Sequence, residues 1–77
     1  MANRIRIVGV DPGLVRTGYG VIEVSGNRLG LVEGGVVQGG DTLLPLEERL
    51  SSLYKGMSEV LIEYNPDAMA LEDLYSH

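Results

Sequence analysis

The chain has 77 residues, of which 44% are hydrophobic and 22% are charged, and its net charge is −5. This length allows one small domain with a marginal core, and the composition is that of a folded chain rather than a disordered one. The acidic balance counts against a strongly basic nucleic-acid-binding module, the lack of cysteine excludes disulfides and thiolate metal sites, and the absence of a signal peptide or membrane span predicts a cytoplasmic protein.

Three strands are predicted in the first half of the chain. Residues 5–10 are rich in β-branched side chains, which is typical of a strand buried on both faces. Residues 18–25 and 29–38 form the next two, and Gly26-Asn27 between them is a favoured two-residue hairpin turn, so these strands should be antiparallel. Gly34-Gly35 inside the third strand indicates a bulge or a crowded crossing.

A helix is predicted over residues 45–64, after a linker at residues 39–42. Its apolar side chains are three and four positions apart and form one stripe: Leu46, Leu50, Leu53, Met57, Val60, Leu61 and Tyr64. Asn65 should end the helix, because the residue before a proline is pushed out of helical geometry. A short apolar strand, DAMALED, follows at residues 67–73.

The order β-β-β-α-β predicts how the strands lie in the sheet. If the first three form a meander, a right-handed helical crossover brings the fourth strand back parallel to the first, with sheet order 3-2-1-4. Asp11 and Glu72 then lie at the carboxyl ends of neighbouring parallel strands, about 5 Å apart. Open α/β sheets place their functional sites at these ends.

Two adjacent carboxylates at this edge favour a metal site. They cannot both stay ionised cheaply unless a cation joins them or one takes a proton. Oxygen ligands select magnesium or manganese over zinc, and such ions can activate a water and stabilise the leaving oxygen of a phosphodiester. Phosphodiester hydrolysis is therefore one candidate reaction, and nucleotide phosphotransfer with an aspartate at the same place is another.

Each residue also has a simpler interpretation. Asp11 precedes Pro-Gly and could serve only to open a turn, and Glu72 could be solvated charge at a strand end. The glycines at 13, 18 and 20 match neither a P-loop nor a dinucleotide-binding fingerprint. Arg16 could contact phosphate or be solvated, and Tyr75 could stack on a base or pack against the sheet.

The motifs as a set resemble a known family. VGVDPGLVRTGYGVIE, PLEERL at the start of the helix and NPDAMALEDLY at the end are similar to the RuvC family of Holliday-junction resolvases, in the ribonuclease H-like superfamily. The spacing of D-P-G-x-x-x-T-G-Y-G before P-D-x-x-x-x-E makes this resemblance specific. It implies an α/β ribonuclease H-like mixed sheet in which residues 1–77 are the N-terminal part of a nuclease domain.

The resemblance also implies roles for single residues. Asp11 matches the family's first metal-binding catalytic aspartate, and Glu72 matches its catalytic glutamate. Tyr75 falls where the family has an aromatic residue that contacts the unstacked junction, and Arg16 and Thr17 are candidate DNA contacts. The implied protein is a homodimeric endonuclease that uses Mg²⁺, with Mn²⁺ as a substitute, to cut four-way junction DNA, and that works with a junction-migrating helicase complex.

The family continues beyond the position of His77 with two further acids. The sequence therefore predicts the front part of a resolvase, with an incomplete metal site and no activity as a 77-residue chain. Three alternatives remain: a RuvX-type pre-ribosomal-RNA nuclease, an actin-like phosphotransferase relative, and a truncated domain without catalysis.

Overall fold

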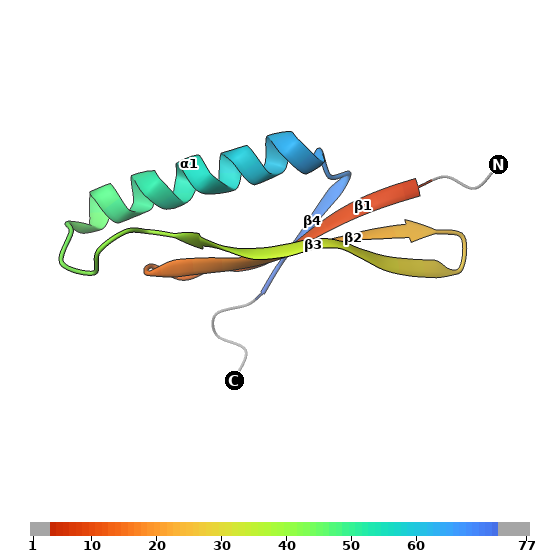
Figure 1. Cartoon of the computed structure of the whole chain (residues 1–77), viewed down its shortest axis with the longest axis horizontal. Helices are drawn as coiled ribbons and strands as arrows, with labels where there is room; N and C mark the ends of the chain where they lie inside the picture. Colours follow the sequence, from red (N-terminus) through yellow and green to blue (C-terminus); the bar gives the residue numbers. More distant parts are fainter. Residues whose placement is uncertain (1–3, 73–77) are drawn as a thin grey trace.

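The computed structural model describes residues 4–72 of the chain. Its elements are β1 (Arg4–Asp11), β2 (Arg16–Ser25), β3 (Arg28–Gln38), α1 (Leu46–Tyr64) and β4 (Ala68–Leu71). The sheet order is β3-β2-β1-β4, in which β1 and β4 are parallel and the other neighbours are antiparallel (Figure 1). The predicted element order and the predicted sheet order are both confirmed.

The β2–β3 hairpin turns at the residues that the sequence indicated. Ser25 pairs with Arg28, and Gly26 between them has φ +60, a conformation that side chains rarely adopt. A positive φ at the first central residue alone is the pattern of a type II′ turn, whose twist matches that of the two strands. The predicted antiparallel pairing of β2 and β3 is therefore confirmed, and it depends on a turn that favours glycine at position 26.

The bulge in β3 lies two residues before the predicted glycine pair. Val21 pairs with Glu33 and Ile22 with Leu31, so Val32 is the extra residue. Of the two interpretations of Gly34-Gly35, the crowded crossing is the correct one. A Cβ added at Gly35 would lie 2.8 Å from the Tyr19 hydroxyl oxygen, because the tyrosine ring covers this position.

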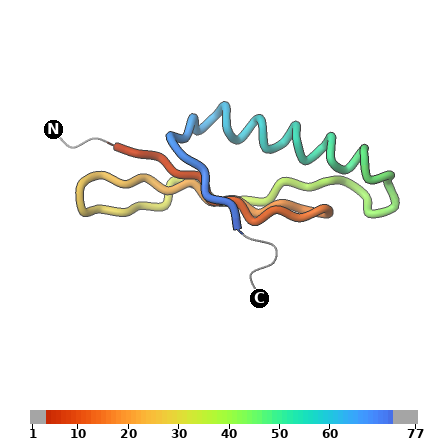
Figure 2. The backbone as a smooth tube through the Cα atoms, turned by 180° about the vertical axis from the view of Figure 1, so that it is seen from behind, coloured from red at the N-terminus to blue at the C-terminus, as the bar shows by residue number. Residues whose placement is uncertain are grey.

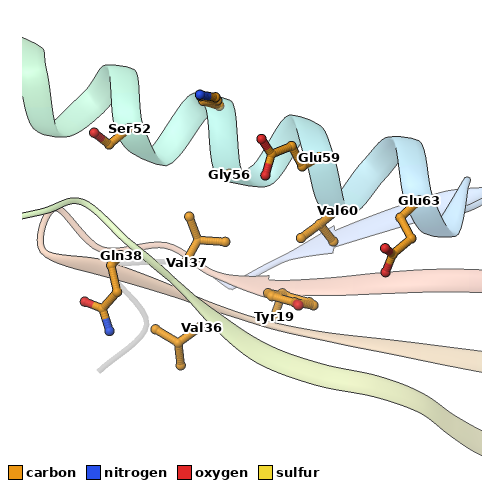
Figure 3. Close-up of a pocket in the computed structure, with 10 residues that line it drawn as sticks. Tyr19, Val36, Val37, Gln38, Ser52, Gly56, Glu59, Val60 and Glu63 are labelled. Atoms are coloured by element: carbon orange, nitrogen blue, oxygen red, sulfur yellow. The ribbon is translucent and has the colours of Figure 1, made fainter.

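Helix α1 lies along one side of the sheet, mainly over β3 and β2 (Figures 1 and 2). It ends at Asn65, which has left-handed φ and ψ of 43° and 59° and donates its N–H to the Leu61 carbonyl at 2.9 Å. Gly56 faces Val37 of β3 across the cleft in Figure 3, and a Cβ there would overlap the valine. This glycine therefore lets the helix approach β3. No helix within residues 4–72 is long and apolar enough to cross a membrane.

The core lies between the sheet and α1. Val8 and Val21 are fully buried, Val10 is nearly so, and the helix side chains that pack against this cluster come from the predicted apolar stripe: Met57, Leu61 and Tyr64. Side chains alternate between the faces of a strand, so Asp11 points to the face opposite Val10. Among the described elements, none covers that face (Figure 2).

Candidate metal site at the sheet edge

Asp11 and Glu72 lie side by side at the carboxyl ends of β1 and β4. The parallel register pairs Val10 with Leu71, and the Glu72 N–H donates to the Val10 carbonyl at 3.0 Å. The next residue of each strand is therefore one of the two acids, and both side chains are exposed on the face away from α1. The juxtaposition inferred from the sequence is confirmed, while the catalytic role of the two residues stays a prediction.

Arg6 and Asp67 fix this register at the other end of β4. The Arg6 N–H donates to Asp67 Oδ2 at 2.8 Å, and the Asp67 N–H donates to the Arg6 carbonyl at 2.8 Å. The Arg6 side chain also pairs with Glu23 at 2.9 Å and donates to the Tyr64 carbonyl at 3.0 Å. One arginine thus joins β1, β2, the end of α1 and the start of β4, and this junction determines which β4 residue reaches Asp11.

The two carboxyl groups interact directly. Asp11 raises the pKa of Glu72 above its usual value, first through a hydrogen bond between the side chains, then through repulsion between their charges, with a smaller effect of burial. A hydrogen bond between two carboxyl groups requires that one of them carries a proton. The position of Glu72 beside Asp11 therefore favours either a proton or a cation.

This interaction predicts a pH dependence of stability. Because the folded chain holds the Glu72 proton more tightly than the unfolded chain, this contribution is complete below the usual pKa of 4.5 and is lost as the pH rises through the raised value. Thermal unfolding in EDTA should therefore show a fall in melting temperature above pH 4.5 that the Asp11→Asn variant lacks. Identical pH profiles for the two proteins would contradict the interaction.

A cavity of about 580 Å³ opens beside the two acids, and its floor is made largely of small residues: Gly9, Gly18, Gly20, Gly35 and Ala70. A Cβ added at Gly20 would meet nothing within 4 Å, and one at Gly18 would meet only the Asp11 Cβ at 3.9 Å. Neither glycine has a positive φ. The fold itself therefore does not require glycine at these two positions, and their effect is to leave the sheet surface bare next to the carboxylates.

The other predicted site residues have different positions. Arg16 is exposed at the start of β2, on the loop that leaves Asp11. Thr17 is only 5% exposed, and its hydroxyl is bonded to both backbone groups of Gly13 at 3.2–3.3 Å. The hydroxyl is thus directed into the turn, and the DNA contact expected for Thr17 stays a prediction. Tyr75 lies outside the described residues.

Sequence reasoning missed Arg49, whose guanidinium donates to the Leu14 carbonyl at 3.1 Å in the loop after Asp11. The only signal was its place in PLEERL, a stretch that contributed to the resemblance without a role for this residue. Within residues 4–72, no group of three or more histidine, cysteine, aspartate or glutamate side chains could hold a metal ion. The site in this part of the chain thus consists of two acids.

Comparison with known families gives one clear match. The family model described as "Crossover junction endodeoxyribonuclease RuvC" matches residues 7–77. Proteins of that name from Bartonella quintana and Rhodopseudomonas palustris are 48% and 49% identical over 75 and 71 residues, which is 97% and 92% of this chain. The same alignments cover 44% and 40% of those relatives, so the chain spans less than half of their length.

Solved structures agree with this match. Thermus thermophilus RuvC in complex with Holliday junction substrate superposes with a TM-score of 0.81 and 31% identity, covering 95% of this chain and 44% of that one. The Aquifex aeolicus PPX-GPPA enzyme has a TM-score of 0.66 and 12% identity, covering 90% of this chain and 26% of that one, which shows a shared fold alone. The ribonuclease H-like fold is thereby confirmed. The family match starts in the strand that delivers Asp11 and runs through Glu72, and the chain belongs to the RuvC family of crossover junction endodeoxyribonucleases.

Proposed function

We propose that the chain supplies two ligands of a divalent-metal site that hydrolyses phosphodiester bonds in four-way (Holliday) junction DNA, in homologous recombination and repair. The observation that carries the proposal is the meeting of Asp11 and Glu72 at the ends of β1 and β4. Membership in the RuvC family supports the junction as substrate, since a relative of 31% identity has been solved with a Holliday junction.

The donor chemistry of the pair fits Mg²⁺, with Mn²⁺ as a substitute. Both side chains offer carboxylate oxygens, and magnesium is usually held by one or two carboxylates together with waters and substrate phosphate. The raised pKa of Glu72, caused by its hydrogen bond to Asp11 and by the repulsion between the two charges, supports a position that favours a cation. A divalent ion bound between the two carboxylates would offset the repulsion between them.

When bound, the ion would lower the pKa of an attacking water and stabilise charge on the leaving oxygen. The chain's own residues position the groups around that chemistry. Asp11 and Glu72 face the cavity from two hydrogen-bonded strands, and the glycine floor allows a phosphodiester backbone to lie close to them. Arg16, which is exposed at the start of β2, would pair with a neighbouring phosphate.

Two symmetric cuts in a junction require two sites, so the proposed active form is a homodimer with two-fold symmetry. It would take its substrate from a junction-migrating helicase complex. The proposed location is the cytoplasm, a reducing compartment that suits a chain without cysteine.

A cleavage assay tests the proposal. The protein, expressed from its natural gene, is incubated with end-labelled four-way junction, linear duplex and single-stranded RNA, in Mg²⁺ or in EDTA. We expect paired cuts in the junction, in Mg²⁺ only. Preferential cutting of the RNA would instead indicate a pre-ribosomal-RNA nuclease, and magnesium-dependent ATP hydrolysis without DNA cleavage would indicate an actin-like phosphotransferase.

The small residues that line the cavity beside the acids predict the effect of substituting Gly20. A valine there has free space, so Gly20→Val should leave stability unchanged or raise it by about 0.5–1 kcal/mol, since glycine weakens a strand interior. Its side chain would occupy the cavity beside the acids and should weaken junction binding at least about tenfold, the equivalent of about 1.4 kcal/mol.

Gly30→Val is the matched control for this prediction. Gly30 of β3 also has nothing within 4 Å of an added Cβ, but it pairs with Glu23 and does not line the cavity. Its valine variant should bind junction DNA like the unmodified protein. Equal binding by the Gly20 and Gly30 variants would show that DNA does not approach this part of the sheet.

A further inference from the structure

The loop at residues 12–15, between Asp11 and Arg16, is tied down from three directions. Thr17 of β2 holds its start, Gly39 after β3 holds its end, and Arg49 of α1 holds its middle. These elements are distant in sequence, and none of the three side chains or backbone groups faces the cavity beside Asp11. The loop is therefore braced from the helix side of the sheet.

Thr17 makes two of these contacts, both with Gly13. Its hydroxyl accepts a hydrogen bond from the Gly13 N–H at 3.3 Å and donates one to the Gly13 carbonyl at 3.2 Å. It is the one buried polar or charged side chain among residues 4–72. A Cβ on Gly13 would collide with the Arg16 carbonyl, so the turn closes on itself at this glycine. Losing the hydroxyl would leave two backbone groups of the turn without this partner.

Arg49 links the loop to the segment that leads into α1. Its Nη1 donates to the Leu14 carbonyl at 3.1 Å, and its Nε donates to the Leu44 carbonyl at 3.2 Å. Beside it, the buried Gly39 donates its N–H to the Val15 carbonyl at 2.8 Å. The planar guanidinium can bond both carbonyls at once, which a lysine ammonium on a flexible stem does poorly.

These contacts bear on the metal site through Asp11. On one side the Asp11 backbone is held by its pairing with Gly18, and on the other it leads directly into the braced turn. A loosened turn would let the end of β1 shift and change the spacing between the Asp11 and Glu72 carboxylates. Metal ligands must be held within about 0.5 Å of the productive geometry, so even a small shift matters.

We infer that Thr17 and Arg49 are positioning residues that fix the 12–15 loop and thereby hold the Asp11 carboxylate where it can share a divalent cation with Glu72. This inference rests on the proposed function, because it concerns the geometry of the same metal site. It assigns neither residue a contact with the ion or with DNA.

The test measures Mn²⁺ affinity by electron paramagnetic resonance on the protein expressed from its natural gene. Thermal unfolding of the same protein is recorded separately. Thr17→Val keeps the shape of the side chain and removes the hydroxyl, Thr17→Ser keeps the hydroxyl, and Thr42→Val in the exposed linker is the matched control. Loss of a group bonded directly to a metal ligand weakens binding about 10- to 100-fold. Thr17 acts one step further away, so we expect its valine variant to weaken Mn²⁺ binding about three- to tenfold, and the serine and control variants to bind normally.

Arg49→Lys keeps the inference testable if Thr17→Val does not fold. It retains the charge and helix propensity but bridges the Leu14 and Leu44 carbonyls poorly, so it should weaken Mn²⁺ binding about twofold to fivefold. The effect should be smaller than that of Thr17→Val, because both hydrogen bonds of Thr17 to Gly13 remain. Lower melting temperatures with unchanged Mn²⁺ affinity in both variants would reduce the two residues to a structural role and overturn the inference. If Asp11→Asn weakens Mn²⁺ binding but Thr17→Val and Arg49→Lys do not, only the inference is refuted. If Asp11→Asn does not weaken Mn²⁺ binding either, the proposed function is refuted as well.

Discussion

Replacing Asp11 with asparagine should abolish metal-dependent junction cleavage while leaving the fold intact. Asparagine keeps the shape of the side chain but lacks the negative charge that the proposed ion requires. Losing a group that only supports a metal ligand costs about 10- to 100-fold in affinity or activity, so losing a ligand should cost more than about 100-fold. The fold should survive, because the substitution removes the charge that repels Glu72 and Asp11 is exposed at a strand end.

Cleavage of an end-labelled junction in Mg²⁺, with melting temperature measured in parallel, tests this expectation. Glu59→Gln is the matched control: it is also an exposed acid changed to its amide, but it lies on α1 beside the cleft on the other side of the sheet (Figure 3). It should cleave like the unmodified protein. Junction cleavage by Asp11→Asn at an undiminished rate would rule out the assigned role of Asp11.

Val8→Ala should have the largest effect on stability. Val8 is fully buried beside Val21 and under the helix side chains. Removing two of its methyl groups from a packed core costs about 2–3 kcal/mol, including the cavity left behind. A domain of this size has only a few kcal/mol to lose. A large share of the molecules should therefore be unfolded at 37 °C, and the urea midpoint should fall sharply.

Val36→Ala is the matched substitution in the same sheet. Val36 lies in β3 and is 54% exposed, so truncating it leaves no cavity and should change the free energy of unfolding by less than about 0.5 kcal/mol. Urea unfolding followed by circular dichroism measures both variants. Similar midpoints for the two would mean that the core is not centred on Val8.

The sheet and the acid pair could be predicted because they depend on patterns with few solutions. Alternating and helical periodicity located the elements, the turn at Gly26-Asn27 made β2 and β3 antiparallel, and the right-handed crossover left one place for β4. Once β4 lies parallel to β1, the acids that follow Val10 and Leu71 must be neighbours. Local signals and one chirality rule were sufficient.

The features that escaped prediction depend on three-dimensional packing. The extra residue of β3 is Val32 rather than a glycine, because the bulge position follows from the register between two long strands, with Tyr19 packed over Gly35. A threonine next to an arginine in a loop resembles a phosphate contact. Only the closed turn at Gly13 shows that the Thr17 hydroxyl points inward.

The role of Arg49 could not be predicted from the sequence either. A charged residue in the first turns of an amphipathic helix is normally solvated, and nothing in its sequence context indicates a bond to a carbonyl 35 positions earlier. The contact exists because α1 begins close to the loop that follows β1 and then runs back over the sheet toward the start of β1 (Figure 1). Residues that position a site through such contacts leave no local pattern.

Asp11 and Glu72 are proposed to act together on one divalent cation, and a double-mutant cycle of Mn²⁺ affinity measures whether they do. The four proteins are the unmodified chain, Asp11→Asn, Glu72→Gln and the double variant, with Glu59→Gln as the control. If both acids hold the same ion, each single variant should lose most of the affinity and the double variant should lose little more. Losses that add independently, or Mn²⁺ binding that survives in the double variant, would mean that the two acids do not share an ion.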